Sequence, residues 1–274
     1  VALLFSFLQL RGAGDGVAER ERQLQPLLAH GGLAFLYLMA PLCFSPYGTA
    51  AAWALAGLAT LLAGLHLGVR SVLISAFVVQ ALGGMIYLIF SDGLDQAVVA
   101  ETLRPLAHLA FWAPVLLALA GLLCAWRLYL AGRGARPELL PLDMNELSHV
   151  ALFWSAAWWL LAALGEISRF VPHERQGHVF LLVAVASLVV TALFALHQRW
   201  PALAVFSLAL VPLGFAALLL TWHPAYHPLA TLGWVAWPAL FAAHFLMLRR
   251  VQGLAPEVLI LSLIHISEPT RLRR

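Results

Sequence analysis

Eight long apolar stretches follow one another along this chain and restrict its fold more than any other feature. They cover residues 27–44, 49–67, 72–90, 108–130, 149–164, 179–195, 201–222 and 229–248. About 20 apolar residues make a helix that crosses the ~30 Å hydrocarbon core of a bilayer. Apolar residues form 62% of the chain and charged residues 11%, against about 45–50% and about 25% in soluble domains. The sequence therefore predicts an all-α, polytopic transmembrane helix bundle with about eight complete spans.

Two parts of this pattern are irregular. The stretch 149–164 is short for a span, so its helix is expected to start earlier or to tilt. Residues 1–10 lack a basic segment and a cleavage site, and are predicted to be the end of a truncated helix rather than a signal peptide. A GTG start codon is the alternative explanation for Val1. Residues 1–260 are predicted to form a single integral-membrane helical domain, an internal fragment of a longer protein.

The last residues of the chain resemble translated adaptor DNA. LSLIHISEPTR at 261–271 is the translation of a transposase-type sequencing adaptor, and 272–274 match the length of the sample index that follows such an adaptor. We therefore expect 261–274 to be a non-native tail that contributes nothing to fold or function. His265 and Glu268 are accordingly not candidate site residues.

Arginine sets the predicted orientation, because the chain contains no lysine. When alternate loops are assigned to one side, that side receives Arg11, Arg20, Arg22, Arg70, Arg127, Arg133, Arg136, Arg199, Arg249 and Arg250. The other side receives only Arg104, Arg169 and Arg175. Cytoplasmic loops carry the excess of basic residues, so the loops that follow residues 10, 67, 130 and 195 are predicted to be cytoplasmic. All-arginine usage with abundant Ala and Leu indicates a GC-rich genome, hence a bacterial inner membrane.

Motifs of well-known enzyme classes do not occur in the sequence. There is no Walker loop, GxSxG, HExxH or GxGxxG motif. Cys43 and Cys124 lie in apolar stretches without CxxC spacing, which predicts buried small side chains and neither a disulfide nor a metal site. The net charge of +3 does not indicate nucleic-acid binding, because the arginines are spread over several loops. No cofactor is expected, and membrane lipids are the partner that the sequence indicates.

Two polar residues within the apolar stretches are candidate substrate-binding residues. His244 lies inside the last stretch, where an ionisable group commonly faces the bundle interior. The favoured interpretation of His244 is a neutral, hydrogen-bonded packing residue that points toward other helices. Gln80 lies beside Gly83 and Gly84, which favours a hydrogen bond across a close helix contact over a substrate contact.

The candidate catalytic residues lie in the two loops predicted to be on the outer face. They are His173, Glu174, His223 and His227, because histidines beside carboxylates can bind zinc or exchange protons. The same segments also contain Glu166, Arg169, Arg175 and His178. A proline-containing turn separates His223 from His227, so their four-residue spacing does not place them on one helical face. The favoured interpretation of these loops is a solvated surface with ordinary charge pairs.

Most of the ten tryptophans lie near predicted helix ends, as Trp112, Trp126, Trp200 and Trp222 do. This placement is typical of the aromatic belt at a membrane interface. Trp154, Trp158 and Trp159 instead form a partly continuous face within one predicted helix. Packing is the favoured interpretation of that face over a chromophore or sugar-binding surface.

Three segments resemble a family of bacterial predicted membrane proteins, grouped as domain of unknown function 2339. These segments are residues 49–90 with their Trp-Ala-Leu helix, HVALFWSAAWWL at 149–160, and HPLATLGWVAWPALFAAHFLMLRR at 227–250. The resemblance covers most of residues 27–251 in the same order. Family members often carry Glu after the Trp-Ala-Leu element, where this chain has Ala56. The resemblance implies a long, many-spanning inner-membrane protein, and it supplies no activity.

Two functions are consistent with these patterns. The first is a non-enzymatic carrier for an envelope-related solute, or a scaffold of the inner membrane. The alternative is a membrane enzyme that acts on a lipid-linked substrate at the outer face through the histidines and Glu174. The first is favoured, because the sequence has no nucleophile–base pair and no metal-ligand spacing.

Overall fold

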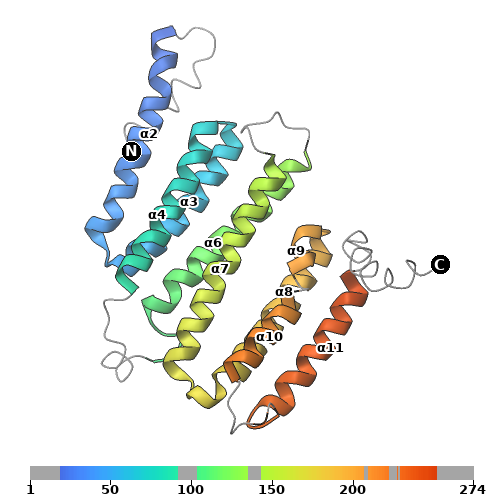
Figure 1. The fold of residues 1–274 in the computed structure, drawn as a ribbon. Coiled ribbons are helices and arrows are strands. Elements are labelled where there is room, and N and C mark those ends of the chain that lie inside the picture. Colours follow the sequence, from blue (N-terminus) through green and yellow to red (C-terminus); the bar gives the residue numbers. More distant parts are fainter. Residues whose placement is uncertain are drawn as a thin grey trace, which may run out of the picture. The chain divides into compact units, whose positions relative to one another are not determined.

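The described part of the chain is helical, in agreement with the predicted all-α class. A computed structural model describes residues 19–91, 104–134, 143–206, 209–221, 227 and 229–251, with side chains from residue 28 onward except at 29, 91, 210, 220, 221 and 251. Its helices are α2 (Glu19–Cys43), α3 (Pro46–Leu67), α4 (Arg70–Ser91), α6 (Leu109–Gly132), α7 (Met144–Phe170), α8 (His173–Gln198), α9 (Pro201–Phe206), α10 (Leu210–Thr221) and α11 (Gly233–Val251) (Figure 1). The predictions for residues 1–10, 261–274, Arg136, Trp222 and His223 lie outside the described residues.

Six of the described helical stretches are long and apolar enough to cross a membrane. They are Pro46–Leu67, Arg70–Phe90, Leu109–Gly132, Met144–Phe170, His173–Gln198 and Pro201–Leu219. The other two predicted spans also lie on helices. One is the shorter apolar part of α2, His30–Cys43, and the other is α11, with 19 residues. The chain is a multi-pass membrane protein.

Helix α7 is longer at both ends than the predicted stretch 149–164. It runs over 27 residues, from Met144 to Phe170. At its start the Asp143 carboxylate accepts a hydrogen bond from the Asn145 backbone N–H at 3.1 Å, which satisfies one of the donors that a helix leaves unpaired. The apolar periodicity stops earlier than the helix, because polar residues such as Glu166 occupy its last turns.

Local turn chemistry sets the ends of α3. The Ser45 hydroxyl accepts a hydrogen bond from the Gly48 backbone N–H at 3.4 Å, and Pro46 stands in the first turn. Both residue types are typical of a helix start. At the other end Gly68 adopts a left-handed conformation with φ 64°, a backbone geometry that glycine reaches without a steric penalty. This turn lets α4 begin two residues later and run back along α3.

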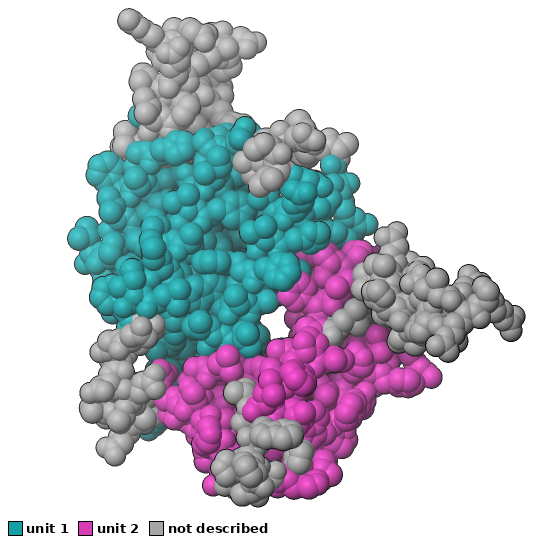
Figure 2. All heavy atoms as spheres, viewed as in Figure 1, with its two compact units in different colours: residues 1–162 teal, residues 163–274 magenta. Residues whose placement is uncertain are grey.

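Contacts divide the chain into two compact units, Val1–Ala162 and Ala163–Arg274, which Figure 2 colours separately. In unit 1, helices α3, α4, α6 and the first part of α7 pack around small residues such as Ala50, Ala54 and Ala118. Gly84 of α4 lets Trp158 approach closely, since a Cβ atom at Gly84 would lie 2.5 Å from the Trp158 ring. In unit 2, α8 packs against α10 and α11.

Candidate functional site

Gln80 lies at the contact between α4, α3 and α6, where the sequence analysis placed a close helix packing. Its side chain is 6% exposed, and its Nε2 donates a hydrogen bond to Cys124 Sγ of α6 at 3.1 Å. A Cβ atom added to Gly57 of α3 would overlap the Gln80 side chain. Gln80 therefore connects three helices, and its carboxamide donor is directed at protein.

Hydroxyl groups provide further bonds between the helices of unit 1. Ser155 and Ser148 of α7 donate to the backbone carbonyls of Ala118 and Ala125 in α6, at 2.7 and 2.8 Å. Tyr87 of α4 donates to the Ala110 carbonyl at 3.0 Å. Hydroxyl bonds to the backbone of another helix satisfy polar groups where lipid offers no water. These contacts fix helix positions.

Two hydrogen bonds connect helix α2 to α3, and the sequence analysis did not anticipate them. The hydroxyls of Tyr37 and Thr60 lie 2.7 Å apart within hydrogen-bonding distance. The indole Nε1 of Trp53 also donates to the Tyr37 carbonyl at 2.8 Å. The sequence signal was a Tyr and a Thr within apolar stretches, which marks polar groups that need a partner but does not identify it.

His244 is half-buried beside the packed face of α11. That face consists of Ala236, Leu240, Ala243 and Met247, which are all buried. The spacing of these residues is that of one helical stripe. The Nδ1 atom of His244 is buried and has no hydrogen-bond partner in the described part of the chain.

The predicted catalytic residues that the structure describes are exposed. His173 and Glu174 occupy the first turn of α8, and the His173 Nδ1 lies 3.3 Å from Gln176 Oε1 of the same helix. His227 is exposed, and its Nδ1 accepts a hydrogen bond from the Leu229 backbone N–H at 3.1 Å. Each of these histidines thus interacts with its own segment.

A buried histidine links the two segments that contain these residues. His178 in α8 is 4% exposed, and its Nδ1 lies 3.2 Å from the Thr231 hydroxyl in the turn before α11. Thr231 has a φ of 53°, a left-handed conformation that is unusual for a β-branched residue. The structure therefore brings the 173–178 and 227–232 segments together through His178, a residue that the sequence analysis placed in this region without ranking it as a candidate.

The donor atoms for a metal do not gather in the described residues. No group of three or more His, Cys, Asp or Glu side chains lies close enough there to hold an ion. The prediction of a buried cysteine is confirmed for Cys124 and wrong for Cys43, which is exposed at the end of α2. Its neighbours Leu42 and Phe44 are exposed as well, so an apolar stretch need not be buried inside the protein.

The tryptophans follow the predictions in part. Trp154 and Trp158 pack edge-to-face with ring centroids 5.5 Å apart, and Trp158 makes the same type of contact with Tyr87. The predicted packing face of α7 is therefore confirmed for Trp154 and Trp158, whereas Trp159 is exposed. Trp112 is 46% exposed, but Trp200 is fully buried, so its assignment to an interfacial belt is wrong. Its position at a tight turn between α8 and α9 places the indole inside the helix packing.

Comparison with protein-family models, with curated proteins and with solved structures finds no match to this chain. Functional conclusions therefore depend on the residues and contacts described above.

Proposed function

We propose that this chain is a non-enzymatic scaffold of a bacterial inner membrane, linked to the cell envelope, with about eight complete spans. The observation that carries the proposal is the way the polar side chains of unit 1 are used. Gln80, Ser148, Ser155 and Tyr87 each bond a neighbouring helix. A carrier for an envelope-related solute requires helices that separate and repack, and such bonds oppose separation.

The arrangement of arginines in unit 1 supports the proposed orientation. Bonds from Tyr47 to the Phe90 carbonyl and from Tyr87 to the Ala110 carbonyl join the ends of helices at one side of the unit. Arg104 precedes α6 on that side, whereas Arg70 and Arg133 lie at the opposite helix ends. We propose that the Arg70 and Arg133 side is cytoplasmic, as the positive-inside rule requires.

Single-cysteine labelling in intact cells tests this orientation. In a background with Cys43→Ser and Cys124→Ala, a membrane-impermeant maleimide should label His173→Cys and should not label Arg133→Cys until the cells are permeabilised. Labelling of Arg133→Cys from outside, with protection of His173→Cys, would refute the orientation.

Hydrogen exchange in nanodiscs tests the scaffold role. The described parts of α3, α4 and α6 should exchange as one slow population, because their packing has a single arrangement. Bimodal exchange in these helices would indicate two packings and would favour a carrier.

A membrane enzyme that acts on a lipid-linked substrate at the outer face is the second candidate. It is favoured by the His178–Thr231 contact, which joins the segments of His173, Glu174 and His227. If this candidate is right, release of phosphate from a lipid-linked pyrophosphate by the purified protein should be lost in His178→Asn. The matched variant His197→Asn, at an exposed position of the same helix, should keep it.

A further inference from the structure

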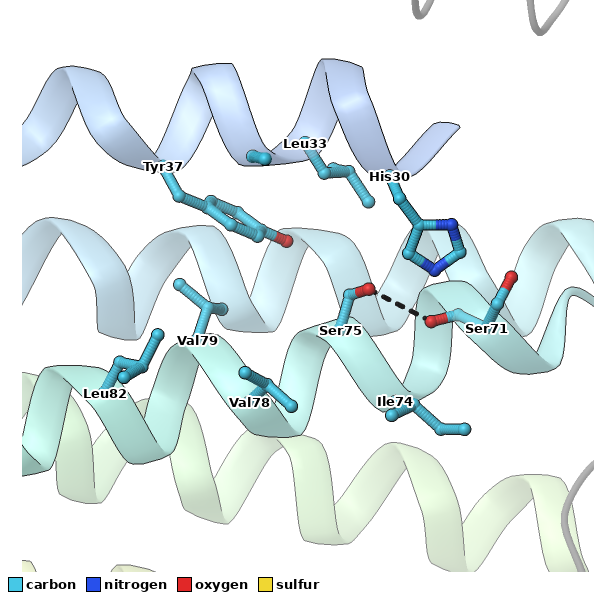
Figure 3. Close-up of a pocket in the computed structure, with 10 residues that line it drawn as sticks. His30, Leu33, Tyr37, Ser71, Ile74, Ser75, Val78, Val79 and Leu82 are labelled. Carbon is cyan, nitrogen blue, oxygen red and sulfur yellow. Dashed lines mark hydrogen bonds between the residues drawn. The ribbon is translucent and has the colours of Figure 1, made fainter. Parts of the chain in front are cut away.

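An open groove of about 430 Å³ lies between α2 and α4 in unit 1 (Figure 3). Its volume is within the ~300–1,000 Å³ of small-molecule sites. His30 and Ser71 lie at one end of the groove and Leu82 at the other, with Ile74 and Val78 between them. The groove therefore has one polar end and an apolar remainder.

The other hydroxyl groups along the groove are bonded to protein. The Ser75 hydroxyl donates to the Ser71 carbonyl at 3.1 Å, and the Tyr37 hydroxyl lies 2.7 Å from that of Thr60. With these hydroxyls occupied, the groove beyond Ser71 offers mainly alkyl surface to an occupant. A hydrocarbon chain suits such a surface.

The length of the groove matches one leaflet of a bilayer. From Ser71 to Leu82 the helix rises about 16 Å at ~1.5 Å per residue, which is close to half of the ~30 Å hydrocarbon core. Ser71 is in the first turn of α4, and Leu82 is near its middle. The groove thus begins at a helix end and stops at mid-depth. A partner helix that spans the membrane would use the full length of α4 instead.

Basic residues of α3 and α4 adjoin the polar end of the groove along the chain. Arg70, the first residue of α4, is exposed and precedes Ser71, and His66 is exposed in the last turn of α3. No Asp or Glu occurs between residues 61 and 75. An exposed arginine at a helix end, where the membrane interface is expected, complements the phosphate of a lipid head group.

We propose that this groove binds one acyl chain of an anionic phospholipid from the leaflet at the Arg70 end. The chain lies along Ile74 and Val78 toward Leu82, and the phosphate lies beside His30, Ser71 and Arg70. This ligand goes beyond the scaffold role, and either conclusion can fail without the other.

Lipid retention measures this binding. The full chain is reconstituted in vesicles of equimolar phosphatidylglycerol and phosphatidylcholine, extracted in mild detergent, and analysed by native mass spectrometry. We expect the protein to retain phosphatidylglycerol in preference to phosphatidylcholine. Ala34→Trp, which fills the groove from α2, should abolish retention. Ala59→Trp, at an exposed position of α3 outside the groove, should not change it.

A charge variant tests the head-group contact. Arg70→Gln should lower the preference for phosphatidylglycerol by up to about fivefold, the upper end of what one charge pair at a water-exposed site contributes. Arg133→Gln removes an exposed arginine at the end of α6 and should leave the preference unchanged. Equal retention of both lipids by the unaltered protein, or equal loss in Arg70→Gln and Arg133→Gln, would overturn the proposal.

Photolabelling gives a readout that does not depend on variants. Phosphatidylglycerol with a diazirine near the end of one acyl chain should label α4 near Leu82. Labelling spread evenly over the exposed faces of α3 and α4 would mean ordinary boundary lipid and would overturn the assignment. In a separate crosslinking experiment, a crosslink from Ala34→Cys to a second copy, or to another segment of this chain, would also overturn the assignment.

Discussion

Replacing Gly57 by Ala should destabilise unit 1, although alanine is the better helix former. A Cβ atom at this position would overlap the Gln80 side chain and would lie 3.1 Å from the Ala76 carbonyl oxygen. Gln80 cannot move freely, because it is buried and bonded to Cys124. The methyl group must therefore separate α3 from α4 or break the Gln80 bond.

The magnitude follows from three effects. Overpacking of a core costs about 1–3 kcal/mol, and loss of a hydrogen bond between membrane helices costs about 0.6 kcal/mol. Replacing Gly by Ala inside a helix stabilises the folded state by about 0.5–1 kcal/mol. The net loss is about 0.6–3 kcal/mol, and its central value of about 2 kcal/mol lowers the melting temperature by roughly 4 °C in a chain of this size.

Thermal unfolding in detergent, followed by tryptophan fluorescence, measures the change. Gly165→Ala in α7 is the matched control, because nothing lies within 4 Å of its added Cβ, and it should melt at the same or a slightly higher temperature. Gln80→Ala supplies the decisive comparison. In the Gln80→Ala background, Gly57→Ala should lower the free energy of unfolding by a smaller amount than in the unaltered chain, and the difference should be at least about 1 kcal/mol. An equal loss in both backgrounds would refute the steric explanation.

Two further substitutions test single contacts by the same melting assay. Ser155→Ala should cost about 0.6 kcal/mol, and no more than about 1.7 kcal/mol, through loss of its 2.7 Å bond to the Ala118 carbonyl. Ser168→Ala, which removes an exposed hydroxyl bonded within its own helix, should have no effect, and equal effects would contradict the interhelical role. Thr231→Val should destabilise by about 1 kcal/mol, because the bond to His178 is lost. Thr231→Asn should be at least as stable as the unaltered chain, since Asn tolerates a left-handed backbone, and a loss like that of the Val variant would argue against this account.

For the polar residues within the apolar stretches, the sequence indicated only that each needs a hydrogen-bond partner. Gln80 within an apolar stretch predicted a bond across a helix contact, because unpaired polar groups are costly in lipid, and the same reasoning applies to Tyr37, for which no prediction was made. The partners themselves, Cys124 and Thr60, are 44 and 23 residues away along the chain. Spacing within one helix carries no information on contacts at that separation.

The sequence by itself determined the all-α fold class and located the six helical stretches that are long and apolar enough to cross a membrane. Apolar content acts locally, through the transfer of each segment into lipid, so each predicted stretch could be located without knowledge of its neighbours. Tertiary structure decided which face of each helix is covered. It buried Trp200 and exposed Cys43, and it left a groove between α2 and α4. These outcomes depend on how side chains of different helices fit together. Lipid and protein interiors are similarly apolar, so hydropathy does not distinguish the two.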